Sequence, residues 1–414
     1  MKAFAGALVA AILASAAAAQ IPYQAAPAAP PGASICPGGL CQPEALAPFF
    51  GQLARIGADR DAGTVHILQI GDSHTAGDRI TGKLRASLQA RFGDGGRGVL
   101  PPGVPWDGYA PLQVEVAADG WTTMLAPLAG NRGYVRAGVG LTGVQAISVE
   151  PGGSLTLRRE TASPDGVRIG LCGEGPGRLE VRADDRVWTP TLEEGCTVLI
   201  AGSGPQEIRF TAPDGALGLD HIRLTHIGGG VELSNLGVVG ATLRDLAARD
   251  QRVVARELAA WRPALVILAF GTNEGFEDGL DARAWEALLR GQILRLRRLS
   301  PGAALMILGA PDALRSGAPN ACSADGRRAP PPSLAVVRDV QRRVAADTGV
   351  AFWDWHGRMG GDCSADRLAT RGEPLMLRDR VHFNSVGADW IGGMLHADLM
   401  AAYEAWSARR GGGE

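Results

Sequence analysis

The spacing of apolar residues divides the chain into three stretches, of which the first is residues 46–104. It opens with apolar positions at helical spacing, continues as the branched run Val65–Ile70, and then shows an amphipathic pattern over Ile80–Phe92. A short apolar run predicts a buried strand, and the helical spacing on either side of it predicts helices. The strand ends abruptly in the polar sequence Gly71–His74, which indicates a tight turn between strand and helix.

Short runs of alternating apolar and polar residues replace the helical pattern from about Pro101 onward. They recur between Gln113 and Thr225, separated by glycine, proline and Asp-Gly turns such as Ala118–Gly120. Evenly spaced short strands with turn residues between them are typical of an antiparallel β-sandwich. Because this stretch interrupts the α/β pattern, we predict that residues 105–230 form an inserted β-sandwich domain.

The helical spacing returns in residues 231–410, where apolar strands alternate with long amphipathic segments. We predict strands over Val231–Val239, Pro263–Phe270, Ala304–Leu308 and Val350–Trp353, and helices over Arg244–Trp261, Ala282–Leu299, Ser333–Thr348 and Val386–Trp406. Strands that alternate with helices form a parallel sheet covered on both faces. Residues 46–104 and 231–410 are therefore expected to make one α/β domain, whose ligands bind beyond the carboxyl ends of the strands.

The amino terminus has the features of a secretory signal peptide over residues 1–20. Lys2 precedes the apolar run Ala3–Ala19, and Gln20 follows it. Residues 21–45, which begin as an alanine- and proline-rich segment, are interpreted as a linker. No later run approaches the ~18 apolar residues that a transmembrane helix needs. We therefore expect an exported protein, periplasmic or secreted, without a transmembrane segment.

Chain length, hydrophobic content and net charge limit the number of domains and the kinds of binding partner. At 414 residues the chain is long enough for two domains, and 46% hydrophobic residues suffice for packed cores. The net charge of −2 gives no electrostatic reason to expect binding to nucleic acid or to an anionic membrane. We expect the protein to act as a monomer.

Six cysteines fit an oxidising compartment. Several pairings are possible, and we prefer the one that joins successive cysteines along the chain: Cys36 with Cys41, Cys172 with Cys196, and Cys322 with Cys363. Neither the cysteines nor the seven scattered histidines show a metal-binding spacing. We therefore predict disulfides and neither a metal site nor a cofactor.

Ser73 follows the first predicted strand directly, where a turn exposes its hydroxyl at the sheet edge. A serine is a weak nucleophile unless a base removes its proton, and histidine commonly serves as that base. Asp379 and His382 are three residues apart before the last predicted helix, so one turn can bring the carboxylate to the imidazole. We predict that Ser73 is the nucleophile, His382 the base and Asp379 the orienting acid. His74 is a rival base, although its place beside Ser73 favours a packing or hydrogen-bonding role.

Attack on an ester creates an oxyanion, which needs preorganised donors that each contribute on the order of 3 kcal/mol. The candidate donors are the backbone N–H groups of Ser73 and Gly240 and the side-chain amide of Asn273, which all follow predicted strands. Simpler interpretations exist for each: Ser73 as a helix cap and Asn273 as a turn residue. Asp379 and His382 have a similar alternative as a cap and a surface histidine. Their occurrence together at strand ends favours catalysis.

The four motifs resemble those of the SGNH (GDSL-like) esterases. Gly71–His74 is similar to block I of that family, Asn235–Thr242 to its glycine block, Gly271–Glu274 to its asparagine block and Asp379–His382 to its Asp-x-x-His block, all in the family order. The resemblance implies a flavodoxin-like three-layer α/β/α fold with a parallel sheet. It also implies ester hydrolysis without a cofactor, with the motif residues in the roles given above: Ser73, Gly240, Asn273, Asp379 and His382.

A narrower resemblance is to the periplasmic peptidoglycan O-acetylesterases of Gram-negative bacteria. It rests on Gly71–Ala76, on the glycine-rich turn Phe92–Gly98, on the signal peptide and on a β domain inserted after the first block. In those proteins the inserted domain resembles a carbohydrate-binding module. Five aromatic residues of this stretch are therefore candidates for a glycan-binding face, although core and rim positions explain them more simply: Trp106, Tyr109, Trp121, Tyr134 and Trp188. The glycine block fits loosely, which leaves Gly237 as an alternative donor to Gly240.

The sequence therefore predicts a secreted serine esterase that removes O-acetyl groups from a polysaccharide, with peptidoglycan as the preferred substrate. An esterase or O-acetyltransferase that acts on another acetylated glycan is the alternative among enzymes. A glycan-binding scaffold with an inactive hydrolase domain is the alternative of a different class, and the complete set of motif residues argues against it.

Overall fold

The computed structural model describes residues 36, 39–59, 62–126, 138–161, 166–174, 176–193, 195–202, 204–317, 322–323 and 325–411. The predicted signal peptide and the first part of the predicted linker lie outside these residues. The end of that linker segment is ordered structure, because Leu40–Cys41 forms strand β1 and pairs antiparallel with Phe352 and Trp353. The side chain of Leu40 is buried there, and removal of its apolar surface from water favours the pairing.

The central sheet has the strand order β1-β21-β18-β17-β2-β16. Its parallel strands are β2 (Thr64–Gly71), β16 (Gly230–Gly237), β17 (Leu265–Ala269), β18 (Ala304–Leu308) and β21 (Ala351–Trp353). β2 lies between β17 and β16, although the whole β-rich stretch separates β2 from β16 along the chain. The two predicted halves of the α/β domain therefore meet in one sheet.

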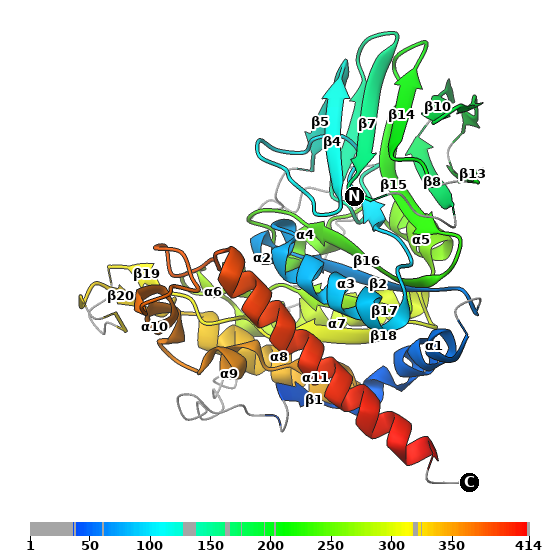
Figure 1. Cartoon of the computed structure of the whole chain (residues 1–414). Coiled ribbons are helices and arrows are strands. Elements are labelled where there is room, and N and C mark those ends of the chain that lie inside the picture. The colour runs from blue at the N-terminus through cyan, green and yellow to red at the C-terminus, as the bar shows by residue number, and fades with distance from the viewer. Residues whose placement is uncertain are drawn as a thin grey trace, which may run out of the picture.

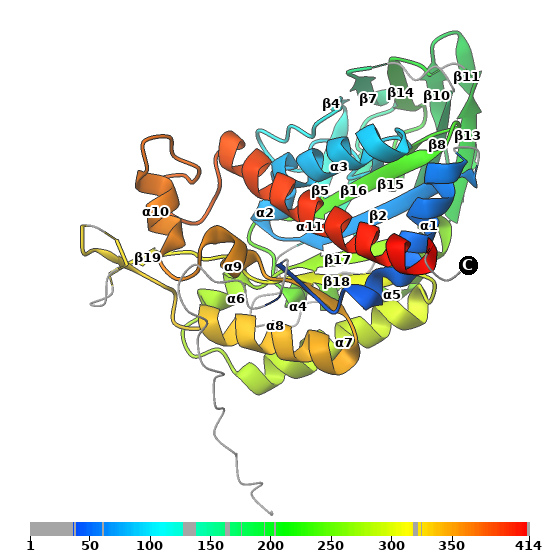
Figure 2. The ribbon, with the colours of Figure 1, turned by 60° about the horizontal axis from the view of Figure 1, so that its bottom comes forward.

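Helices cover both faces of this sheet and give three layers (Figures 1 and 2). One face is covered by α1 (Ala47–Ala58), α3 (Arg79–Phe92) and α11 (Ser385–Gly411), and the other by α5 (Gln251–Trp261), α7 (Ala282–Leu299) and α8 (Leu334–Thr348). Successive strand residues point to opposite faces, so Ile67 of β2 packs in one core and Leu68 in the other. The predicted three-layer α/β/α fold is confirmed.

The β-rich stretch forms a sandwich that rises above the α/β domain in Figure 1. One sheet has the order β11-β10-β14-β7-β4, and the other has the order β13-β8-β15-β6-β5 with β3 also paired to β15. The strands are β3 (Gly98–Leu100), β4 (Val114–Asp119), β5 (Trp121–Leu125), β6 (Val144–Ser148), β7 (Gly153–Arg159), β8 (Val167–Glu174), β10 (Glu180–Ala183), β11 (Arg186–Trp188), β13 (Gly195–Ala201), β14 (Glu207–Ala212) and β15 (Gly218–His226). All pairings are antiparallel, which confirms the predicted sandwich.

Two short hairpin-like pairings complete the described strands. β9 (Gly177–Arg178) pairs with β12 (Thr191–Leu192) in the sandwich, and β19 (Arg315–Ser316) pairs with β20 (Arg328–Ala329) beyond the end of β18. β3 comes before residue 105, where we expected the insertion to begin. Its pairing with β15 therefore extends the antiparallel sheet into the preceding segment.

The aromatic residues of the β-rich stretch fall into two groups. Trp121 is buried and Trp188 packs against the sandwich core, which supports a core role for both. Trp106 and Tyr109 lie on the segment that leads into the sandwich, with ring centroids 5.1 Å apart. Tyr134 lies outside the described residues.

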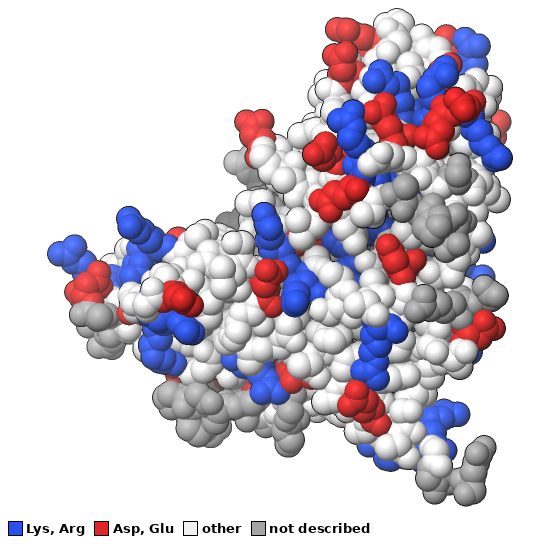
Figure 3. Space-filling model, viewed as in Figure 1, with Lys and Arg blue, Asp and Glu red and all other residues white. Residues whose placement is uncertain are grey.

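Three disulfides join the cysteines in the preferred pairing: Cys36–Cys41, Cys172–Cys196 and Cys322–Cys363. The second links the neighbouring strands β8 and β13, and the third links the segment before β20 to the start of α10 (Ser364–Thr370). None of the helices in the described residues combines the length and apolar character needed to span a bilayer. Basic and acidic side chains are intermingled on the sandwich in Figure 3, in keeping with the small net charge.

Candidate active site

The candidate residues lie on loops at the carboxyl ends of three neighbouring strands. Ser73 begins the short helix α2 (Ser73–Ala76) directly after β2. Gly240 lies between β16 and α4 (Leu243–Ala247), and Asn273 lies on α6 (Thr272–Gly275) after β17. Because β16, β2 and β17 are adjacent and parallel, these loops meet at one edge of the sheet.

Ser73, His382 and Asp379 form a continuous chain of hydrogen bonds. The Oγ atom of Ser73 lies 2.8 Å from Nε2 of His382, and Nδ1 of His382 lies 2.7 Å from Oδ2 of Asp379. An ionised carboxylate only accepts hydrogen bonds, so Nδ1 donates to Asp379 and Nε2 is left to accept the proton of Ser73. This is the arrangement that activates a serine for attack on a carbonyl carbon.

Asp379 is held as a carboxylate by the turn to which it belongs. Its Oδ1 accepts the backbone N–H groups of Val381 and His382, at 2.9 and 3.1 Å. Partial burial raises the pKa of Asp379, but the hydrogen bonds from the His382 ring and from these N–H groups outweigh burial and lower the pKa below its usual value. The negative charge that orients His382 is therefore present at neutral pH.

The turn from Asp379 to His382 has a strained backbone that its neighbours hold in place. Arg380 has a φ angle of 59°, in the left-handed region that costs a non-glycine residue about 1 kcal/mol. Its Nε donates to Asp366 of α10 at 3.1 Å, and its carbonyl accepts the N–H of Leu314 at 3.0 Å. Arg328 of β20 donates to the carbonyl oxygen of Asp379 at 2.8 Å. Sequence reasoning missed these supports, because nothing local marks such distant partners.

His74 bridges the nucleophile turn and the acid–base turn. Its Nε2 lies 2.9 Å from the carbonyl oxygen of Val381, and its Nδ1 lies 3.2 Å from Oδ1 of Asp72, which caps α2. Burial lowers the pKa of His74, but the hydrogen bond and charge of Asp72 outweigh it and raise the pKa above its usual value. With both ring nitrogens facing acceptors, His74 has the hydrogen-bonding role that we favoured over that of a base.

The two glycines considered as oxyanion donors have different surroundings. The N–H of Gly237 donates to Oδ1 of Asn235 at 3.1 Å, and a Cβ at this position would lie 2.1 Å from the backbone nitrogen of Ala76. Gly237 is therefore needed for the close packing of β16 against α2. Gly240 has a φ angle of 77°, and no partner for its N–H or for that of Ser73 is found among the described residues. This difference favours Gly240 over Gly237 as a donor.

Asn273 and Glu274 connect the loop that follows β17 to the loop that follows β16 by hydrogen bonds. Nδ2 of Asn273 donates to the carbonyl oxygen of Ala241 at 2.8 Å, which uses one of its two amide N–H groups. The buried carboxyl group of Glu274 accepts the N–H of Leu243 at 2.7 Å and that of Gly271 at 3.0 Å. Burial raises the pKa of Glu274 to about 7. Sequence reasoning missed Glu274, although it directly follows Asn273 in the motif.

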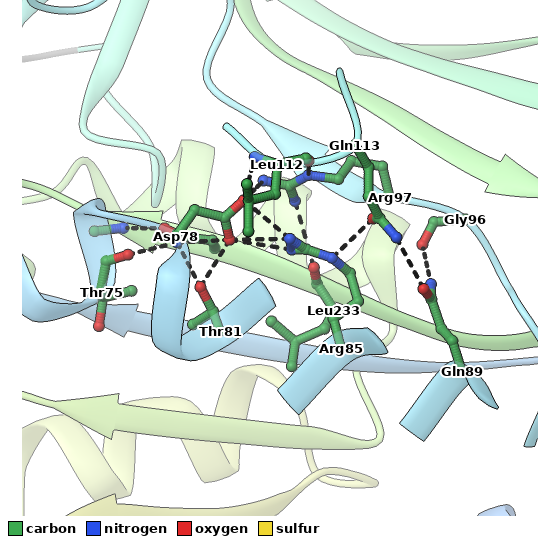
Figure 4. Close-up of polar contacts among 12 residues, drawn as sticks. Thr75, Asp78, Thr81, Arg85, Gln89, Gly96, Arg97, Leu112, Gln113 and Leu233 are labelled. Carbon is green, nitrogen blue, oxygen red and sulfur yellow. Dashed lines mark hydrogen bonds and ion pairs between the residues drawn. The ribbon is translucent and has the colours of Figure 1, made fainter. Parts of the chain in front are cut away.

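A buried cluster around Asp78 lies next to the nucleophile helix (Figure 4). Asp78 follows α2 closely, and its carboxylate accepts hydrogen bonds from Arg85, from Arg97 at 2.9 Å and from the N–H of Leu112 at 2.8 Å. Burial raises the pKa of Asp78, but the two guanidinium groups outweigh burial and lower it. Asn235 of β16 donates to the same carboxylate and to the carbonyl oxygen of Thr75. The cluster thus joins α2, β16 and the segment that enters the sandwich.

One further group of possible metal ligands lies among the described residues near this edge, and it consists of Asp312, His356 and Asp362. A guanidinium nitrogen of Arg338 lies 3.6 Å from Oδ1 of Asp362. This positive charge offsets the carboxylates, and the N–H of Ala365 donates to Asp312 at 2.9 Å. We therefore assign no ion to this group.

Comparison with known proteins shows a family match and a strong structural similarity. Residues 201–390 match the profile of the GDSL-like Lipase/Acylhydrolase family. The structure is similar to a solved structure of a peptidoglycan O-acetylesterase, with a TM-score of 0.76 and 28% identity over 88% of this chain and 99% of that chain. No curated protein matches the sequence.

Two other solved structures are similar only at low TM-scores. An acetyl xylan esterase has 17% identity and a TM-score of 0.31 over 41% of this chain and 80% of its own. A family two carbohydrate esterase from Clostridium thermocellum has 10% identity and a TM-score of 0.29 over 70% of this chain and 100% of its own. They add nothing to the assignment.

The fold and the ordered motifs are similar to those of SGNH hydrolases, and residues 201–390 match the profile of the GDSL-like family. The chain is an esterase by class, and it is similar over most of its length to the peptidoglycan O-acetylesterase described above.

Proposed function

We propose that this protein is a periplasmic or secreted serine esterase that removes O-acetyl groups from peptidoglycan, with Ser73, His382 and Asp379 as its catalytic residues. The observation that carries the proposal is the chain of two hydrogen bonds, 2.8 Å from Ser73 to His382 and 2.7 Å from His382 to Asp379. Both distances are within the range over which a serine can transfer its proton to a histidine that a carboxylate orients.

The reaction begins when Oγ of Ser73 attacks the acetyl carbonyl carbon and its proton passes to Nε2 of His382. The N–H groups of Ser73 and Gly240 and the amide of Asn273 stabilise the oxyanion. The intermediate collapses to an acetyl-enzyme as the sugar oxygen leaves with the proton from His382. Water then gives a proton to His382, attacks the acetyl-enzyme and releases acetate and free Ser73. No cofactor takes part in these steps.

The exposure of the site favours water over a sugar hydroxyl as the final acceptor. The side chains of His382 and Asp379 are 40% and 43% exposed, so water reaches the base directly. A transferase has to keep water away from its acetyl-enzyme, and the described residues provide no such cover here. We therefore favour hydrolysis over acetyl transfer.

The substrate proposal rests on similarity and compartment. The solved structure that matches 88% of this chain is a peptidoglycan O-acetylesterase, and three disulfides suit an oxidising compartment outside the cytoplasm. Peptidoglycan lies in that compartment and carries acetyl esters on its sugars. We therefore propose that the protein acts on an acetylated polysaccharide and not on nucleic acid. We also propose that it acts as a monomer.

The test is acetate release from O-acetylated peptidoglycan, acetylated xylan and a small aryl acetate at matched ester concentrations. We expect turnover of the aryl acetate and a higher kcat/KM on acetylated peptidoglycan than on xylan. Equal or faster release from xylan would show that peptidoglycan is the wrong substrate. Absence of turnover on all three, with a folded protein that a serine-directed phosphonate does not label, would support a binding scaffold instead.

A further inference from the structure

A second cleft lies at the opposite edge of the sheet from Ser73. It has a volume of 1020 Å³ and is lined by Thr64, where β2 begins, and by Pro263 and Pro301, which precede β17 and β18. Its other wall comes from β8, β13 and β15 of the sandwich, of which β8 and β15 lie close to α5 in Figure 1. Since β2 rises about 3.3 Å per residue, the cleft lies roughly 23 Å from the catalytic edge.

The charged groups that line this cleft are arginines. Arg55 comes from α1, Arg262 follows α5, and Arg168 and Arg223 come from β8 and β15. Among the described residues that line the cleft there is no aspartate or glutamate. The α/β domain and the sandwich thus each contribute two positive charges, in a chain whose net charge is −2.

These arginines differ in how they are paired. Arg223 forms an ion pair with the buried Glu232, which is also held by Thr225 at 2.8 Å. Arg55, Arg168 and Arg262 are exposed, and the described residues provide no carboxylate partner for them. The positive charge of the cleft is therefore largely uncompensated.

The opposite sheet of the sandwich provides the contrast. There Arg158 is paired with Glu207 at 2.8 Å, although both side chains are exposed. Arg182 is likewise paired with Glu180 at 3.3 Å. In the cleft, by contrast, Arg55, Arg168 and Arg262 have no carboxylate partner among the described residues, and one sign of charge between two walls concentrates the potential.

We propose that this cleft binds the carboxylate groups of peptide chains attached to peptidoglycan. The proposal deepens the proposed function and depends on it for the identity of the polymer. The guanidinium fork matches a carboxylate with two parallel hydrogen bonds. Val198, which is 60% exposed, and the two prolines offer apolar contacts to the small side chains of such peptides.

A site this far from Ser73 holds the polymer without touching the reacting ester. It retains the enzyme on the peptide-bearing wall, while glycan strands of the same network reach the catalytic edge. Loss of the site should therefore weaken polymer binding and raise KM for the polymer. Loss of the site should leave kcat for the polymer unchanged. Turnover of a small aryl acetate should also be unchanged.

The test measures binding of the full chain to insoluble peptidoglycan by co-sedimentation, in a Ser73→Ala background that prevents turnover. The double variant Arg55→Gln with Arg168→Gln removes one cation from each wall. Arg158→Gln with Arg182→Gln is the matched control on the opposite sheet. We expect the apparent Kd to rise at least about tenfold for the cleft variant and to be unchanged for the control, since only the cleft variant loses guanidinium groups that can bind a carboxylate. The same glycan stripped of its peptides should bind both variants equally.

Two results would overturn the proposal. The first is equal binding of the cleft variant and the control to intact peptidoglycan. The second is that the cleft variant loses as much binding to the stripped glycan as it loses to intact peptidoglycan. With Ser73 restored, the cleft variant must also turn over the aryl acetate as the parent does, which excludes misfolding. If the parent binds through the cleft but releases no acetate from O-acetylated peptidoglycan, the proposed function fails and the cleft proposal stands. If it releases acetate while the cleft variant binds normally, the cleft proposal alone fails.

Discussion

Nε2 of His74 lies 2.9 Å from the carbonyl oxygen of Val381, a residue 307 positions away in the sequence. His74 belongs to the turn that presents Ser73, and Val381 to the turn that presents His382. The second ring nitrogen faces the helix-capping carboxylate of Asp72. One buried imidazole therefore fixes the position of the base relative to the nucleophile.

Replacing His74 should affect the chemical step more than substrate binding. His74→Phe keeps a ring in the site but removes both hydrogen bonds. We expect kcat on an aryl acetate to fall roughly 10- to 100-fold with KM nearly unchanged, because a displacement of about 1 Å can cost up to 100-fold. His74→Gln retains one hydrogen-bond donor for the carbonyl oxygen of Val381, so its kcat should fall less than that of His74→Phe. Steady-state kinetics decide this, and a His74→Phe enzyme with normal kcat would show that the bridge has no positioning role.

The same histidine should make stability depend on pH. Burial lowers the pKa of His74, but Asp72 and the carbonyl of Val381 outweigh it, so the pKa is raised in the folded protein, with Asp379 adding a smaller effect. A raised histidine pKa contributes stability that is fully present below the unfolded value of about 6.5 and is lost as pH rises through the folded pKa.

The free energy of unfolding of the parent should therefore exceed that of His74→Gln by more at about pH 5.5 than at about pH 9. Urea unfolding of both proteins at both pH values measures this difference. The same difference at both values would mean that the His74 proton does not contribute to stability.

Asp78 should be one of the residues on which folding depends most. Arg85 is fully buried and Arg97 is 4% exposed, and both donate to this carboxylate. Asp78→Asn leaves two buried cations without a counter-charge and should lower the free energy of unfolding by about 3–5 kcal/mol. Asp119→Asn, at the exposed end of β4, is the control and should stay within about 0.5 kcal/mol of the parent. Chemical denaturation measures the free energy of unfolding of both variants. Equal values would show that folding does not depend on the Asp78 carboxylate.

The two glycines of the second loop should respond differently to alanine. A Cβ at Gly237 would lie 2.1 Å from the backbone nitrogen and 2.6 Å from Cα of Ala76, so the backbone itself has to move. We expect Gly237→Ala to cost about 1–3 kcal/mol or more. Gly240→Ala meets the strain of its φ angle of 77°, which costs about 1 kcal/mol. Thermal unfolding should rank the melting temperatures as parent, Gly240→Ala, Gly237→Ala, and the reverse order of the two variants would contradict this account.

The parts of the fold that follow from local patterns were predictable from the sequence. The apolar strands of the parallel sheet and the polar residues at their ends are visible in the sequence itself, and these local patterns indicate Ser73, Asp379 and His382. Trp121–Leu125 and Val144–Ser148, which form β5 and β6, do not alternate cleanly between apolar and polar residues, so their sequences alone do not predict strands.

Contacts between distant segments could not be predicted in the same way. Nothing near Arg328 indicates that it reaches Asp379, and nothing near Asp366 indicates that it pairs with Arg380. The pairing of Leu40 with Trp353 likewise depends on tertiary packing and not on local propensity. A single sequence shows which residues suit a turn or a strand, but not which of them meet.

The central claim is that Ser73 is the nucleophile of an acetylesterase. The most direct measurement is acetate release from O-acetylated peptidoglycan by the parent and by Ser73→Ala, with circular dichroism and melting temperature to show that the variant is folded. The account predicts that Ser73→Ala loses about 10⁴-fold or more of the rate, since loss of a nucleophile removes the covalent pathway. Release of acetate by the folded variant at more than roughly 1% of the parent rate would contradict it.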